Sequence, residues 1–469
     1  MTTAGSREGS PIPWPDGDRS RELLERVLAA VHEPADVRYY REQWTTLRSA
    51  NSMLYQPHSE TVESISLRIC SEDGRLGVAT STEISAEGIA ALVRRARALA
   101  QVAPAVRDFP GFPEDPGTPT PAIPVARGVF QDDLEARGQA LADAFAVVED
   151  EIGPARISGV VNQGISQLAV ANTSGLHRNS YRTVAQANFL TEIASRDPPP
   201  SGWAEMAHWD PARLDLIGLA REAARITPRV RPRMAKPGRY RVLLSGSALF
   251  ELLSFLSWMG LGALSVEEGW SFLVNGQGKR VAAPEITLAD DPRNPRGLPA
   301  ALDAEGLPMR RRTLIDRGVA RGPAHDTLTA ARARTRSTAN ALPPEAPAGS
   351  IGPIPRNLLL RPGTATLEEL VKELRRGILV TRFHYVRSVH PGKTTLTGMT
   401  RDGTYWVERG EVQHPITNLR FTEGILSTLA GTELVGGKVR AYSDERGFMS
   451  AVLPSLVSRS FTFPSATTF

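Results

Sequence analysis

A proline-rich segment about a quarter of the way along the chain most constrains how this sequence can fold. Between positions 104 and 124, seven of the 21 residues are proline, and Gly, Thr and acidic residues stand between them. Proline fixes φ and lacks a backbone N–H, so this run continues neither a helix nor a central strand. The chain is therefore predicted to divide here, and its 469 residues also exceed one ordinary hydrophobic core.

The spacing of apolar residues predicts helices and strands on both sides of this linker. Before it we expect a helix, two strands joined by a turn at 72–75, and a helix capped by Ser85, at 21–32, 61–70, 76–81 and 85–99. After it we expect a helix, two strands and a helix, at 134–148, 157–171, 181–193 and 213–226. From 238 onward, short strands with Gly and Pro turns predominate.

This pattern predicts an α+β fold of several domains. The expected parts are a flexible tail, an N-terminal α/β domain, a proline-rich linker, a small middle domain and a larger β-rich C-terminal domain, at 1–19, 20–110, 111–124, 125–232 and 233–469. A second proline-rich stretch, at 228–237, marks the last boundary.

Composition argues against several classes of protein. The apolar fraction of 41% and the charged fraction of 23% are those of a soluble globular chain. The net charge is only +4, and the densest arginine clusters, at 229–233 and 310–312, are short and lack interleaved aromatic residues. We therefore expect no nucleic-acid partner.

The N-terminus and the single cysteine indicate the compartment. The first residues are polar, with no positively charged start leading into an apolar run, and no stretch has the roughly 18 apolar residues of a membrane helix. Cys70 has no second cysteine with which to form an intrachain disulfide. The sequence thus predicts a cytoplasmic protein without membrane contact.

A series of short motifs gives the chain a family resemblance. They include Leu67-Arg-Ile69, Asp73-Gly-Arg75, Ser271-Phe-Leu273, Leu302-Asp-Ala-Glu-Gly-Leu-Pro308, Leu314-Ile-Asp316, Gly377-Ile-Leu-Val-Thr381, Tyr405-Trp-Val-Glu408 and His414-Pro-Ile416. Because they occur in the family's order over nearly the whole chain, the sequence resembles the TldD/PmbA family. It is most similar to the PmbA (TldE) branch. The resemblance implies an N-terminal α/β domain, a small middle domain and a β-rich C-terminal domain.

The resemblance also implies a zinc site, which this sequence lacks. TldD-type subunits carry His-Glu-x-x-x-His on a helix and a late cysteine, so that two imidazoles and a thiolate hold the metal and leave one position for water. The corresponding helix should lie between 240 and 271, where Phe250 and Phe255 flank Glu251 at the histidine positions. No histidine occurs between His208 and His325. We expect no metal in this chain, and zinc in a partner subunit.

Other polar residues remain as candidates. Glu251 is either a relic of the catalytic acid or an exposed helix residue, and we favour the second. Asp303 and Glu305 precede Gly306; paired carboxylates can perform acid–base chemistry, but we favour a structural role in orienting a turn.

The segment from Arg382 to His390 is the third candidate. Even spacing along a strand would place His384 and His390 on one face as a metal pair, although no third ligand lies nearby. We favour contacts with a peptide or partner through Arg382, Phe383, His384, Tyr385 and His390.

Three functions follow from these observations. The first is a non-catalytic, metal-free subunit of a heterodimeric zinc peptidase, paired with a TldD-like subunit that carries His-Glu-x-x-x-His and acting on unfolded peptides or precursor leaders. The second is a stand-alone homodimeric protein that binds peptides without cutting them. The third is an enzyme with a repurposed site built from Glu251, His384 or His390. We favour the first.

Overall fold

The computed structural model describes residues 17–106, 108–130, 133–193, 195, 199–345 and 351–467. Of the predicted tail at 1–19, residues 1–16 lie outside this part, and residues 17–19 begin the first helix. The structure is a mixed α/β fold of four sheets, with most strands in its C-terminal half, which confirms the predicted fold class. No helix among the described residues is both long and apolar enough to cross a bilayer.

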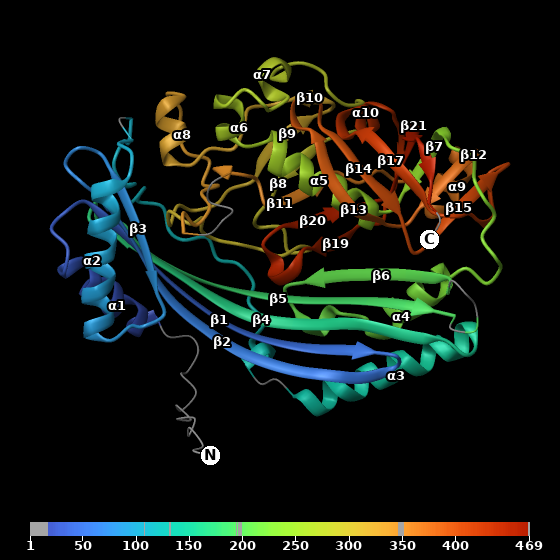
Figure 1. The fold of residues 1–469 in the computed structure, drawn as a ribbon, viewed down its shortest axis with the longest axis horizontal. Coiled ribbons are helices and arrows are strands. Elements are labelled where there is room, and N and C mark those ends of the chain that lie inside the picture. The colour runs from blue at the N-terminus through green and yellow to red at the C-terminus, as the bar shows by residue number, and fades with distance from the viewer. Residues whose placement is uncertain are drawn as a thin grey trace.

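One long antiparallel sheet forms the N-terminal half (Figure 1). Its strands, in spatial order, are β3 (Leu76–Ser81), β2 (Met53–Cys70), β1 (Ala35–Ala50), β4 (Arg156–Asn172), β5 (His177–Glu192) and β6 (Ser201–His208). Its helices are α1 (Gly17–Ala29), α2 (Ala86–Val102), α3 (Leu134–Ile152) and α4 (Leu216–Ile226), with short 3₁₀ turns η1 (Arg127–Phe130) and η2 (Pro211–Arg213). We call this sheet, with its six strands β1 to β6, the N-terminal sheet.

The N-terminal sheet continues across the linker predicted at 111–124. Strand β1 pairs with β2 on one side and with β4 on the other along almost its whole length. The helices cover its two ends separately. Leu24 of α1 and Leu92 of α2 belong to one apolar cluster, whereas Leu141 of α3 and Leu219 of α4 belong to another. The predicted N-terminal and middle units therefore share one sheet and keep separate cores.

Three smaller sheets build the C-terminal part. The first contains β10 (Val319–Ala320), β9 (Arg312–Asp316), β8 (Leu288–Asp290), β11 (Asn357–Leu360), β20 (Ser450–Leu453) and β19 (Arg440–Ser443). The second contains β16 (Glu411–Pro415), β15 (Thr404–Glu408), β12 (Arg376–Val380), β7 (Gly238–Leu244), β21 (Leu456–Phe463) and β18 (Thr432–Val435). The third contains β13 (Phe383–His390), β14 (Thr395–Thr400), β17 (Leu419–Gly424) and β22 (Ser465–Ala466).

One helix, α5 (Gly246–Gly260), runs through the core between these sheets. Seven of its apolar side chains belong to the main buried cluster: Ala248, Leu249, Phe250, Leu252, Leu253, Leu256 and Met259. The other helical segments that lie wholly within the described residues are α6 (Ala263–Glu267), α7 (Leu273–Gly276), α8 (Thr327–Arg332), α9 (Leu367–Leu374), α10 (Ile425–Ala430), η4 (Pro391–Lys393) and η5 (Glu445–Gly447). Because α5 is apolar on most of its circumference, the surrounding sheets hold it from several sides.

The two halves meet along β6 and the face of the N-terminal sheet that looks toward β19 and η5 (Figure 1). A small apolar cluster crosses this boundary: Trp44, Val184 and Ala207 from the sheet contact Leu298 from the C-terminal part. Arg440 of β19 adds an ion pair with Glu222 of α4. The candidate functional residues lie on both sides of this junction.

Candidate functional site

Helix α5 carries the position at which the zinc motif was expected. Ser245 caps the helix, since its side chain accepts a hydrogen bond of 3.2 Å from the backbone N–H of Ala248. Phe250 is buried and stacks on Tyr442 of β19, with 6.3 Å between ring centroids. Phe255 is half-buried and meets Trp258 edge to face at 6.0 Å. Both phenylalanines are thus packing residues of the core and its rim.

The residues of α5 do not fit a zinc ion. Zinc requires nitrogen, sulfur or oxygen donors, and phenyl rings offer none. Cys70 ends β2 in the N-terminal sheet, where burial raises the pKa of its thiol. Within the described residues, no three His, Cys, Asp or Glu side chains are grouped so that they could hold a metal ion. We therefore derive no chemical step through a metal on this chain.

Glu251 lies at the junction of the two halves and is half-buried, which corrects the expectation of an exposed side chain. Burial, the larger cause, and the nearby carboxylate of Glu205 together raise its pKa to about 7, while the Arg382 guanidinium acts against both. No described residue forms a hydrogen bond with the Glu251 side chain, whereas the Glu205 carboxylate accepts one from Ser247 Oγ. Glu251 is thus a desolvated acid facing across the boundary from α5 to β6.

Arg382 lies in the same junction. Its guanidinium stacks over the Trp203 ring of β6 at 3.7 Å and pairs with Asp402 at 2.7 Å. Asp402 also accepts a hydrogen bond of 2.6 Å from Ser201 Oγ, at the start of β6. Arg382 therefore holds β6 against the C-terminal part. Of the predicted site residues, the structure brings Glu251 and Arg382 together.

Glu205, Trp203 and Asp402 complete this junction and were missed in the sequence. The short segment Trp203-Ala-Glu205 alternates like any edge strand. Its approach to α5 depends on long-range packing, so the local pattern carried no signal for it. The residues at this junction are paired with one another or half-buried, and they form no nucleophile–base pair.

The rest of the segment 383–390 divides into buried and exposed residues. Phe383 is fully buried, with 4.5 Å to the Phe421 ring and 5.4 Å to the Phe461 ring, so the expected contact with a peptide or partner is wrong for this residue. Tyr385 is 60% exposed and has a positive φ of 51°. It therefore remains available for such a contact.

The two histidines of this segment do not form a metal pair. The pairing of β13 with β14 is irregular between His384 and Arg387 and again between Ser388 and His390, so even spacing does not define a common face. His384 Nδ1 lies 3.4 Å from Arg401 Nη1, and burial lowers the pKa of His384. His390 Nδ1 accepts a hydrogen bond of 3.3 Å from the Lys393 N–H.

Asp303 organises a buried turn. Its Oδ1 accepts hydrogen bonds from the backbone N–H groups of Glu305 and Leu307 at 3.0 and 2.9 Å, and its Oδ2 accepts one from Ala341 at 3.0 Å. Burial and the neighbouring Glu305 carboxylate raise the pKa of Asp303, while the three N–H donors act against them. All of these partners are backbone groups, so the geometry suits a structural role.

Glu305 and Gly306 connect this turn to the N-terminal sheet. The Glu305 carboxylate lies 3.8 Å from Arg68 of β2 and accepts a hydrogen bond of 3.0 Å from the Thr327 N–H. Gly306 has a φ of 76°, and a Cβ there would lie 2.9 Å from Leu176 and 3.0 Å from Val170. The turn from Asp303 to Gly306 is therefore one of the contacts that hold the C-terminal part on the sheet.

Comparison with known proteins identifies the family. The family described as PmbA/TldA metallopeptidase domain 1 matches residues 35–100, and the PmbA/TldA metallopeptidase C-terminal domain matches residues 237–465. The chain belongs to the PmbA/TldD family of metallopeptidase-like proteins. This confirms the resemblance read from the ordered motifs.

Curated relatives are distant. A protein named metalloprotease from Methanothermobacter thermautotrophicus is 23% identical over 64% of this chain and 67% of its own length. Metalloprotease PmbA of Escherichia coli O157:H7 is 24% identical over 47% of this chain and 46% of its own length. The chain thus spans between about half and two thirds of the length of these relatives.

Solved structures share the fold over almost the whole chain. TldE from Thermococcus kodakarensis superposes with a TM-score of 0.84 at 17% identity, covering 95% of this chain and all (100%) of that one. A Thermotoga maritima protein described as a candidate modulator of a DNA gyrase gives 0.82 at 21% identity, covering 94% and 99%. At these identities the likeness establishes the fold.

Proposed function

We propose that this chain is a non-catalytic subunit of a two-component zinc peptidase, of the PmbA (TldE) branch, working in the cytoplasm. The observation that carries the proposal is the packing of α5: Phe250 and Phe255, which stand where the resemblance expects the two zinc-binding histidines, make aromatic contacts instead. The zinc and the activated water would belong to a homologous partner that carries His-Glu-x-x-x-His. The substrates would be unfolded peptides or precursor leaders.

An unpaired strand edge supports the assembly with another chain. Strand β3 pairs with β2 only over residues 65–70, so the outer edge of β2 from Met53 to Ser64 has no partner strand among the described residues. Its first residues are apolar and exposed: Met53 is 66% exposed, Leu54 43% and Tyr55 75%. An open edge with exposed apolar side chains suits pairing with a second chain.

The test is reconstitution with the TldD-like homologue from the same genome. We expect the purified chain to show no chelator-sensitive cleavage of an unfolded peptide such as reduced casein, and to bind no stoichiometric zinc. Cleavage should appear on mixing with the homologue, together with a heterodimer by light scattering. Zinc-dependent cleavage by the pure chain would overturn the proposal.

The same β2 edge also permits the second candidate, a homodimer that binds peptides without hydrolysis. The two proposals differ in the outcome of mixing. A homodimer that does not exchange subunits with the homologue, and leaves the activity of that homologue unchanged, would favour the second.

A further inference from the structure

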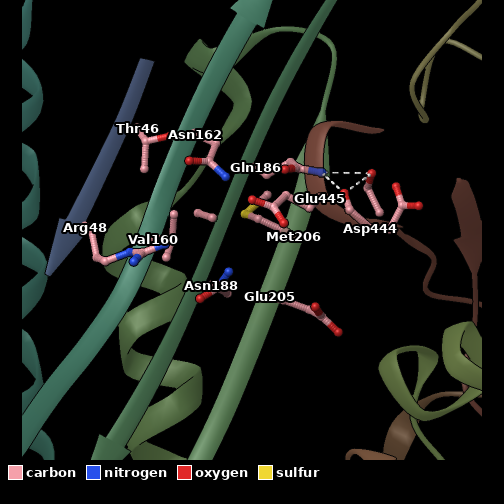
Figure 2. A pocket seen from close by; sticks show the side chains of 12 residues that line it. Thr46, Arg48, Val160, Asn162, Gln186, Asn188, Glu205, Met206, Asp444 and Glu445 are labelled. Carbon is pink, nitrogen blue, oxygen red and sulfur yellow. Dashed lines mark hydrogen bonds between the residues drawn. The ribbon is translucent and has the colours of Figure 1, made fainter. Parts of the chain in front are cut away.

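A polar cleft lies on the face of the N-terminal sheet that looks toward η5, and its lining side chains do not belong to the junction around α5, apart from Glu205. Figure 2 shows it from close by. Its volume is about 310 Å³, within the range of about 300–1,000 Å³ typical of small-molecule sites. Four neighbouring strands supply its floor, with Thr46 of β1, Asn162 of β4, Asn188 of β5 and Met206 of β6. Asp444 and Glu445, before and in η5, form the opposite wall.

The cleft contains a buried acceptor without a donor. Asn162 is 8% exposed, and its Oδ1 has no hydrogen-bond partner among the described residues. Leaving a buried polar atom unpaired costs about 1–3 kcal/mol. The adjacent Gln186 is different, because its amide N–H donates to Ser443 Oγ at 2.9 Å and to the Asp444 carbonyl. Gln186 thus holds the wall in place, while Asn162 is left to accept an N–H from a molecule in the cleft.

Charge is distributed unevenly around the cleft. Arg48 of β1 is exposed and forms no ion pair with a described residue. On the other side, Glu445 is exposed as well, and Asp444 keeps one carboxylate oxygen bonded to the Met449 N–H at 2.8 Å. Figure 2 shows Arg48 and this acidic pair on opposite sides. A ligand with a negative group at one end and a positive group at the other is therefore complementary to Arg48 and to the acidic pair.

We propose that this cleft binds a short peptide with both termini free. Its carboxylate would pair with Arg48, its ammonium group with Asp444 and Glu445, and one of its peptide N–H groups would donate to Asn162 Oδ1. Charge-assisted hydrogen bonds of this kind are about twice as strong as neutral ones. The link to proteolysis rests on the proposed function, since such peptides are what a peptidase releases; the binding itself does not depend on it.

The experiment is calorimetric titration of the purified full-length chain with tri-alanine and, separately, with N-acetyl-tri-alanine amide. Tri-alanine should bind, and the blocked peptide, which lacks both charges, should bind at least tenfold more weakly. Arg48→Gln and Glu445→Gln should each weaken tri-alanine binding at least tenfold. Arg94→Gln, an exposed arginine on α2 away from the cleft, is the matched control and should not change it.

Asn162→Leu separates ligand binding from folding. The substitution removes an unpaired acceptor and keeps the branching and the number of side-chain heavy atoms, and the open cleft has room for the larger methyl groups. The melting temperature should therefore hold or rise while the affinity falls. Equal binding of the free and blocked peptides, no binding of tri-alanine, or unchanged affinity in Arg48→Gln would overturn the proposal. Because the titration needs neither the homologue nor cleavage, its failure is distinguishable from failure of the reconstitution.

Discussion

The turn from Asp303 to Gly306 and the Glu251 position on α5 both carry buried or half-buried carboxyl groups, but they differ in how many hydrogen-bond donors these groups have. In the turn from Asp303 to Gly306, three backbone N–H groups saturate the Asp303 carboxyl group, and Glu305 faces Arg68. On α5, Glu251 has no hydrogen-bond partner among the described residues and stands between two phenylalanines of the motif position. Both sites are acidic, but the number of hydrogen-bond donors differs. Asp303 has three and therefore stabilises the fold, whereas Glu251 has none among the described residues.

The largest loss of stability should come from removing the Asp303 carboxyl group, which accepts three hydrogen bonds in the turn. In Asp303→Ala, three buried N–H groups lose their partner, and we expect a loss of about 3–5 kcal/mol of unfolding free energy. Denaturant unfolding followed by circular dichroism measures it. The control is Asp316→Ala, whose ion pair with Arg321 is exposed, so this substitution should leave the unfolding free energy nearly unchanged. Equal losses of unfolding free energy in Asp303→Ala and Asp316→Ala would show that the three hydrogen bonds of Asp303 do not stabilise the fold.

The two motif phenylalanines should differ from each other. Phe250 is buried against Tyr442, so Phe250→Ala should cost about 3–4 kcal/mol. Phe255 is half-buried, and Phe255→Ala should cost about 1–2 kcal/mol. Thermal and urea melts of the two variants give the comparison. A larger loss for Phe255 would mean that α5 is packed differently from the arrangement described above.

A third test concerns the close approach of the turn to the N-terminal sheet. Gly306→Ala combines a positive φ of 76° with contacts of 2.9 Å and 3.0 Å, and we expect a loss of about 2–3 kcal/mol. Gly269→Ala is a matched control, because Gly269 has a φ of 79° and no atom lies within 4 Å of the position that its Cβ would take. It should cost about 1 kcal/mol, from backbone strain alone. Similar losses would show that the contact with Leu176 and Val170 does not constrain the turn.

The smallest effect should be the pH dependence of Glu251. Its pKa is raised from 4.5 to about 7, so between these values the unfolded chain ionises while the folded chain stays protonated. Stability is therefore lost as pH rises through this window, and the deficit stays constant above it. Since the side chain is part-exposed, we expect about 1 kcal/mol.

Glu251→Gln should remove this deficit. The variant should match the parent at pH 4 and exceed its stability at pH 8. The difference between the two chains is the relevant measurement, because burial also raises the pKa of Asp290 and of Asp444 to about 6. A variant that is less stable at pH 8 would contradict the description of Glu251 as an unpaired acid.

Local patterns in the sequence predicted the four α-helices of the N-terminal half, α1 to α4. The helix expected at 134–148 is α3 (Leu134–Ile152), and Ser85 caps α2 as expected by accepting a hydrogen bond from the Gly88 N–H. The β-rich C-terminal half is also as expected. These features depend on residue periodicity and on caps within a few positions, which a single sequence displays.

The strand β1 (Ala35–Ala50) was not predicted, and neither was its pairing with β4. Its sequence mixes Arg, Glu and Gln with Tyr and Trp, because buried Arg38 and Arg41 replace the apolar residues of an ordinary alternating strand. The cleft was missed for a different reason. Thr46, Asn162 and Asn188 lie far apart in the sequence, and only the register of β1, β4 and β5 brings them together. Polar residues at alternate positions of these strands were the one available signal.

The shared N-terminal sheet has a mechanical consequence. Four of its strands contain 16 to 18 residues, which corresponds to about 50 Å of hydrogen-bonded backbone. A continuous sheet of this length, with a separate apolar core packed at each end, should bend less than two domains joined by a flexible linker. A molecule that binds at the tip of the β1–β2 hairpin is therefore held at a fixed distance from α1 and α2, because the strands between them form one continuous sheet.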